Sequence, residues 1–78
     1  MGETVDQTAS DLQWTVRYTW KVVKGPPHPE HTYEKRPSES RAIDCAVFML
    51  DQNNSSAPLH IVCAHIQAPG SDAWQRIE

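Results

Sequence analysis

The sequence predicts a small α+β domain in which a single helix packs across a mainly antiparallel sheet, in the order β-β-α-β-β. Three observations support this fold. Residues 13–23 alternate between apolar and polar side chains, residues 38–51 repeat apolar side chains with the helical period, and residues 59–67 form a second run rich in β-branched residues. A chain of 78 residues has room for one domain. We expect this domain to span 13–78 and to follow a flexible, polar arm at 1–12.

The helix is expected from Ser38 to Asp51. The Ser38 side chain can accept a hydrogen bond from the unpaired amides of the first turn, and Pro37 disfavours an earlier start. Polar turn-forming residues at 53–56 end the helix. At about 100° per residue, five apolar side chains form a stripe that should cover the sheet. These are Ala42, Ile43, Ala46, Val47 and Leu50.

The strand at 13–23 is expected to be half-buried, with one apolar face under the helix. That face consists of Trp14, Val16, Tyr18, Trp20 and Val22. Three prolines within 24–29 end this strand, and residues 30–36 are expected to pair with it through a short second strand in which Tyr33 points inward.

The strand at 59–67 is apolar on both faces when its side chains simply alternate. One face would carry Leu59, Ile61 and Cys63, and the other Val62, Ala64 and Ile66. Such a strand should be central, and its second face should be covered by the N-terminal arm or by a second subunit. After a turn at 68–72, residues 73–77 are expected to return as a short last strand that carries Trp74.

The formal net charge of −3 argues against an extensive nucleic-acid-binding surface, although a local one remains open. Arg17, Thr19 and Lys21 lie on the outer face of the first strand, with further cations nearby in sequence: Lys35, Arg36 and Arg41. No aromatic residue is interleaved with these charges in the way that single-strand binders require, which favours solubility as their role.

No basic segment followed by an apolar one opens the sequence and no apolar run reaches about 18 residues, so we expect neither a signal peptide nor a membrane span. The two cysteines lie within a helix and a strand, where they are expected to be reduced. We therefore expect a soluble, cytoplasmic protein.

Histidine and cysteine pairs raise the question of a metal site. His28 and His31 are close in sequence, as are Cys63 and His65, but a structural zinc site needs four converging ligands and no Cys-x-x-Cys pair is present. Three glycines form no phosphate-binding loop. We expect neither a metal nor a cofactor.

Nucleophilic catalysis is the next alternative. Cys63 and His65 face the same way but lie about 6.5 Å apart along a strand, whereas simple alternation places His60 and Cys63 on opposite faces. Structural cysteines are the favoured interpretation, so we expect no enzymatic activity.

Phe48 falls nearly opposite the apolar stripe of the helix and is expected to be exposed. Exposed aromatic side chains often anchor interfaces, although the N-terminal arm could instead fold over this ring. The expected protein interface comprises Phe48, Arg41, Asp44, Asp51, Cys45 and Met49. Small size, the two-faced strand and Phe48 together predict a homodimer.

The sequence also shows a strand ending in Tyr33-Glu34-Lys35, then Pro-Ser-Glu-Ser-Arg-Ala opening a helix, then a strand from Leu59 to Ile66. Over residues 13–77 this layout resembles that of very small phage-encoded proteins, among them anti-CRISPR inhibitors of type I surveillance complexes. The resemblance implies a non-enzymatic inhibitor in the host cytoplasm that docks on a CRISPR complex and blocks target DNA by occlusion. The alternative is a small nucleic-acid-binding or regulatory domain that uses the basic strand face.

Overall fold

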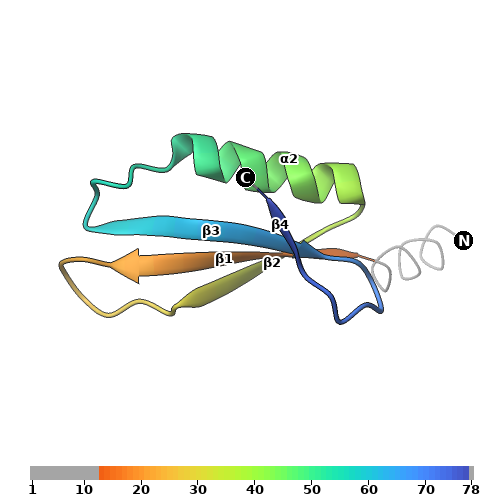
Figure 1. Ribbon diagram of the computed structural model, residues 1–78, viewed down its shortest axis with the longest axis horizontal. Coiled ribbons are helices and arrows are strands. Elements are labelled where there is room, and N and C mark those ends of the chain that lie inside the picture. Colours follow the sequence, from red (N-terminus) through yellow and green to blue (C-terminus); the bar gives the residue numbers. More distant parts are fainter. Residues whose placement is uncertain (1–12, 78) are drawn as a thin grey trace, which may run out of the picture.

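The computed structural model describes residues 13–77, which form a four-stranded antiparallel sheet with a helix across one face (Figure 1). The elements are β1 (Trp14–Val22), β2 (His31–Arg36), α2 (Glu39–Gln52), β3 (Leu59–Gln67) and β4 (Gln75–Ile77). In space the strands follow the order β2-β1-β3-β4. The predicted α+β fold and its β-β-α-β-β order are confirmed. The predicted arm at 1–12 lies outside the described residues.

Helix α2 begins and ends close to its predicted bounds. Ser38 is its N-cap, and the Ser38 hydroxyl accepts a hydrogen bond from the Arg41 amide at 3.3 Å. At the other end, the Asn53 amide donates to the Leu50 carbonyl at 3.2 Å. The helix contacts the sheet through two fully buried alanines, Ala42 and Ala46.

The buried face of α2 is rotated relative to the predicted stripe. Val47 was expected in the core, but 41% of its surface is exposed. Cys45 and Met49 were expected outside the core, but both pack against it. The reason is that small side chains occupy the line where the helix comes closest to the sheet, so that the larger side chains on either side of this line fill the core. These flanking residues are Cys45 and Met49 on one side, and Ile43 and Leu50 on the other.

A β-bulge in β3 changes which of its side chains face the helix. Thr19 of β1 pairs with Cys63, but Trp20 pairs with Ile61, so Val62 has no partner in β1. One extra residue reverses the alternation along the bulged strand. The apolar side chains on both sides of the bulge therefore point to the same face of the sheet.

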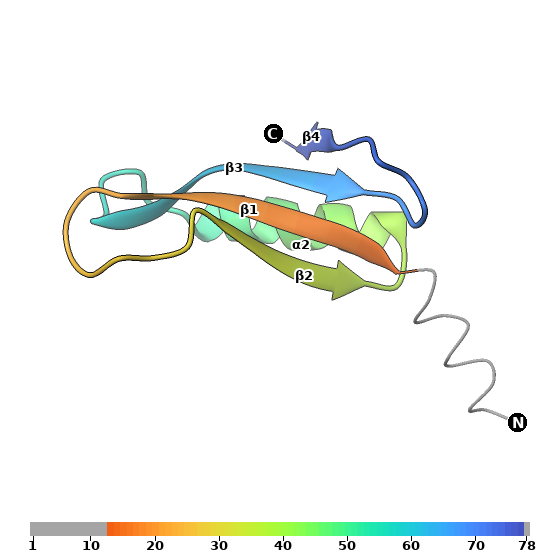
Figure 2. The same ribbon diagram turned by 90° about the horizontal axis from the view of Figure 1, so that it is seen from below.

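As a result, Ile61, Ala64 and Ile66 are all buried beneath α2, whereas 54% of the Val62 surface is exposed. The predicted division of β3 into two apolar faces is wrong. Nor do His60 and Cys63 face opposite ways, because the register places both on the side away from α2. Figure 2, which views the sheet from that side, shows α2 behind the strands and no described helix in front of them.

The free edge of β3 is closed by a side chain. Strand β4 pairs only with residues 64–66 of β3, which leaves the first half of that edge without a neighbouring strand. The Asn53 carboxamide occupies this edge: its Nδ2 donates to the Ile61 carbonyl at 2.8 Å, and its Oδ1 accepts from the Ile61 amide at 2.9 Å. These two hydrogen bonds replace those that a further strand would make.

Enlarging Ala46 is expected to destabilise the fold. Because Ala46 is completely buried against the sheet, Ala46→Leu should lower the free energy of unfolding by about 1–3 kcal/mol through overpacking. Val47 is the next residue along the helix and its side chain is exposed, so Val47→Leu should change the free energy of unfolding by less than about 0.5 kcal/mol. Urea denaturation of both variants measures the difference, and equal effects would contradict this orientation of α2.

Candidate functional site

The face of the sheet away from α2 carries most of the cations of the strands. We call this surface the open face. Its members follow from the strand register and from side-chain contacts across the strands, such as Lys35 Nζ to Thr15 Oγ1 at 2.8 Å. They are Thr15, Arg17, Thr19 and Lys21 of β1, His31, Tyr33 and Lys35 of β2, His60, Val62, Cys63, His65 and Gln67 of β3, and Arg76 of β4.

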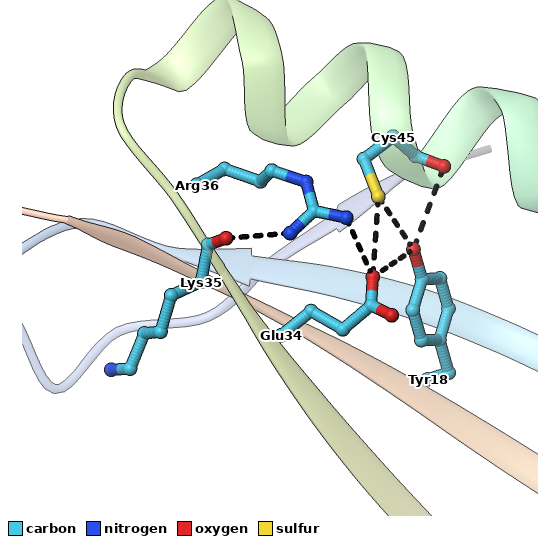
Figure 3. A network of polar contacts seen from close by, with 5 residues as sticks. All are labelled: Tyr18, Glu34, Lys35, Arg36 and Cys45. Carbon is cyan, nitrogen blue, oxygen red and sulfur yellow. Dashed lines mark hydrogen bonds and ion pairs between the residues drawn. The ribbon is translucent and has the colours of Figure 1, made fainter.

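No strand residue within 13–77 places a carboxylate on the open face. The acidic residue of the four strands is Glu34, and it lies on the helix side of the sheet. There its carboxylate forms an ion pair with Arg36 at 3.1 Å and accepts from the Cys45 thiol at 3.3 Å (Figure 3). The open face therefore has a locally positive charge, although the whole chain is slightly acidic.

One row of directly opposed residues crosses all four strands. Tyr33 of β2 pairs with Arg17 of β1, Arg17 pairs with His65 of β3, and His65 pairs with Arg76 of β4. We call these four residues the transverse row. His65 thus lies between two arginines, one on each neighbouring strand.

Trp74 brings an aromatic ring onto the transverse row. It lies in the connection between β3 and β4, and its ring centroid is 4.3 Å from the Arg17 guanidinium carbon and 6.4 Å from the Tyr33 ring centroid. The Tyr33 side of this cluster is open, because 57% of the Tyr33 surface is exposed. The Arg17 Nε is buried and has no hydrogen-bond partner among the described residues, which leaves one donor of this cation unsatisfied.

Sequence reasoning identified part of this site. It named Arg17, Thr19 and Lys21, and these do lie together on the open face. It expected no aromatic ring among the cations, which is wrong because the fold places Tyr33 and Trp74 beside Arg17. Tyr33 was predicted to point inward, which is wrong, because the pairing of β2 with β1 places it opposite Arg17 on the open face. Trp74 was predicted within the last strand, but it precedes β4.

His65, at the centre of the transverse row, has a lowered pKa. Desolvation is the largest cause, followed by the positive charges of Arg17, Arg76 and His31. The Cys63 sulfur lies 4.0 Å from His65 Nδ1, and both residues are half-buried. The imidazole therefore sits in a cationic environment.

The predicted interface around Phe48 lies on the other side of the molecule. Phe48 is 61% exposed and stands beside a shallow hollow of about 400 Å³. The hollow brings together four of the six predicted interface residues, and its lining consists of Arg36, Pro37, Arg41, Asp44, Cys45 and Phe48. Arg36 and Arg41, predicted near the basic strand face, thus belong to the helix side.

The other two predicted interface residues lie elsewhere. Met49 packs against the core and lines a separate hollow with Trp20 and Ile61. Asp51 is exposed on α2 but does not line the hollow beside Phe48.

A polar network that includes Cys45, one of the residues lining the Phe48 hollow, ties α2 to the sheet (Figure 3). The Tyr18 hydroxyl lies 3.1 Å from the Cys45 sulfur and 3.5 Å from a Glu34 carboxylate oxygen. Burial raises the pKa of Tyr18 far above its usual range, and Cys45 and Glu34 raise it further. Tyr18 therefore stays neutral and acts as a structural hydrogen-bonding group.

Within residues 13–77, no three histidine, cysteine, aspartate or glutamate side chains lie close enough together to hold a metal ion. His28 and His31, the pair that raised this question, have separate contacts. His28 Nδ1 lies 2.8 Å from the Pro29 carbonyl oxygen, and His31 Nδ1 lies 3.1 Å from Thr19 Oγ1.

No family model matches this chain, and neither a curated protein nor a solved structure is significantly similar to it. In the described part of the chain, no helix has the length and apolar character needed to cross a membrane. The function therefore has to be argued from the open face and the Phe48 hollow.

The lowered pKa of His65 is expected to make stability depend on pH. Its pKa in the unfolded chain is near the ordinary histidine value of 6.5, and its pKa in the folded protein is lower. Between these two values the unfolded chain binds more protons, so the contribution of His65 to stability is lost as pH falls from about 6.5 to the folded pKa. Urea denaturation at a series of pH values measures this loss, and His65→Gln should reduce it. An unchanged pH slope in this variant would contradict the assignment.

Proposed function

We propose that the protein binds single-stranded nucleic acid on its open face. The observation that carries this proposal is the Arg17 guanidinium stacked on Trp74 beside the exposed Tyr33 ring, on a face of the sheet where the described strands place no carboxylate. Cationic side chains bind the phosphates of a nucleic acid, and exposed rings stack on unpaired bases. The open face offers both kinds of group.

The shape of this surface favours a single strand over a duplex. Among the described residues, no helix lies on the open face that could enter a groove of duplex DNA (Figure 2), whereas unpaired bases can lie flat on exposed rings. Four-stranded sheets with surface aromatic residues are a known platform for such stacking. Tyr33 lies on the edge strand β2, so its ring is accessible from the side as well as from above.

The net charge of −3 is compatible with this proposal, because no carboxylate of the described strands lies on the open face. In the described residues the carboxylates lie on α2, on the helix side of β2 and in connecting segments. These are Glu30, Glu34, Glu39, Asp44, Asp51 and Asp72. A local cationic surface can therefore meet a phosphate backbone, with an affinity that falls as salt rises.

Removing an open-face ring or cation is expected to weaken nucleic-acid binding. Tyr33→Ala should cost about 1–3 kcal/mol of binding through lost stacking. Lys35→Ala should lower the affinity and the slope of its salt dependence by about one phosphate contact. Arg41→Ala, which removes a cation from the exposed surface of α2, is the matched control. Fluorescence anisotropy with labelled oligothymidylate of about ten nucleotides, at about 50 and 200 mM salt, measures these effects.

Two results would argue against the open face as the binding site. One is the absence of binding to the oligonucleotide at the lower salt concentration. The other is an equal loss of affinity in Arg41→Ala and Lys35→Ala, which would indicate a response to total charge. Circular dichroism of each variant controls for loss of folding.

A second candidate function is favoured by the exposure of Phe48 beside its hollow. Here the protein is a non-enzymatic inhibitor that binds a protein partner through α2. An anti-CRISPR inhibitor that docks on a type I surveillance complex and blocks target DNA is the specific form of this candidate. A second copy of the chain, giving a homodimer, is the other partner that this surface would serve.

Phe48→Ala is expected to leave the fold intact, because most of the ring is exposed, and to abolish a function that depends on the helix surface. Two assays measure this: target-DNA binding by a purified type I surveillance complex in the presence of the protein, and light scattering for self-association. Val47→Ala, which truncates the exposed neighbouring side chain on α2, is the control. If the protein has no effect on the complex and keeps a mass near 8.8 kDa at every concentration, this candidate is excluded.

A further inference from the structure

We propose that His65 is a proton-linked phosphate contact, so that the open face binds single-stranded nucleic acid more tightly as pH falls from neutral to mildly acidic. This inference rests on the proposed nucleic-acid function and adds a mode of regulation to it. The position of His65 between two arginines supports the inference. The experiment below distinguishes a failure of this inference from a failure of nucleic-acid binding itself.

The geometry of the transverse row gives His65 its role. His65 lies on β3 between Arg17 of β1 and Arg76 of β4, and all three residues are directly opposed across the strands. Opposed residues in antiparallel strands have Cβ atoms about 5 Å apart. A single phosphate above β3 can therefore contact the imidazole and a neighbouring guanidinium together. Tyr33, at the end of the row, is then placed to stack on an adjacent base.

The charged side chains that the described strands place around the imidazole are all cationic: Arg17 of β1, Arg76 of β4 and Lys35 of β2. The other titratable groups there are Cys63, whose sulfur is 4.0 Å away, and His31 and Tyr33 of β2. Helix α2 packs on the opposite face of the sheet and contributes none. The connection between β3 and β4, which carries Trp74, contributes Asp72. No carboxylate of the described strands lies on the face of the sheet that carries His65.

Binding and protonation therefore favour each other. In the free protein, desolvation and the cations Arg17, Arg76 and His31 hold the pKa of His65 below its usual value, so the ring is mostly neutral at pH 7. A bound phosphate supplies the missing negative charge and raises this pKa. By linkage, nucleic acid that binds the charged ring more tightly also binds more tightly at lower pH.

The remaining histidines of the open face differ from His65 and provide a control. His60 is opposed to Lys21 at the far end of β1, and its Nδ1 lies 2.9 Å from the Ala57 carbonyl oxygen. His31 lies on the edge strand, where its Nδ1 contacts Thr19 Oγ1 at 3.1 Å. Neither lies between two arginines.

The experiment measures the affinity of the full chain for labelled oligothymidylate at constant ionic strength between about pH 7.5 and pH 5.5. Thymine and the phosphodiester group do not titrate in this range, so any change in affinity comes from the protein. Three variants accompany the natural sequence: His65→Gln, which keeps the ring position neutral; His65→Lys, which keeps it charged; and His60→Gln, the matched control. Proton NMR of the His65 ring, with and without the oligonucleotide, reports its pKa directly.

We expect the affinity of the natural sequence to rise roughly tenfold over this range. His65→Gln should lose most of the rise, His65→Lys should bind tightly with little dependence on pH, and His60→Gln should behave like the natural sequence. The oligonucleotide should also raise the pKa of His65.

An unchanged pH dependence in His65→Gln, or an unchanged His65 pKa in the complex, would overturn this inference while leaving nucleic-acid binding in place. Binding that is lost in Tyr33→Ala but does not vary with pH would have the same consequence. If the oligonucleotide binds at no pH, both the inference and the proposed function are wrong.

Discussion

A helix can cover only one face of a four-stranded sheet, and the rest of the structure within residues 13–77 depends on that limit. Helix α2 lies over one face through Ala42 and Ala46, and the large buried side chains Val16, Tyr18 and Ile66 collect beneath it. The other face carries residues that would be costly to bury: two arginines, two lysines and three histidines. The packing of the core and the chemistry of the open face are thus two results of one alternation of side chains.

The sequence predicted this architecture well because its periodic patterns are local. The alternation at 13–23 predicts a strand and the helical period at 38–51 predicts a helix, and the structure contains both as β1 and α2. The errors came from properties that no local pattern contains. The bulge at Val62 depends on how β3 is registered against β1, and the rotation of α2 depends on which side chains fit at its closest approach to the sheet. Both features are set by the partner surface.

The candidate site shows the same division. The cations of β1 were recognised because they share one strand, and the exposure of Phe48 followed from the helical period. The stacking of Trp74 on Arg17 was missed because the two residues belong to opposite ends of the chain and meet only when β4 pairs with β3. The transverse row likewise arises from four strands. It places His65 between two arginines that belong to different strands, which no pattern within one strand can show.

The Asn53 carboxamide has a consequence for solubility. Strands with a bare, apolar edge are templates on which further chains can grow into fibrils. At the start of β3 the edge is already occupied, because the Asn53 side chain pairs with both polar groups of the Ile61 backbone. A strand from another chain would have to break these two hydrogen bonds before it could pair with this edge, which disfavours polymerisation through β3. At the opposite border, β2, a side chain also occupies a backbone group, because Arg36 Nη1 donates to the Lys35 carbonyl at 2.6 Å (Figure 3). The sequence of this strand, HTYEKR, adds charged side chains, which disfavour edge-to-edge pairing.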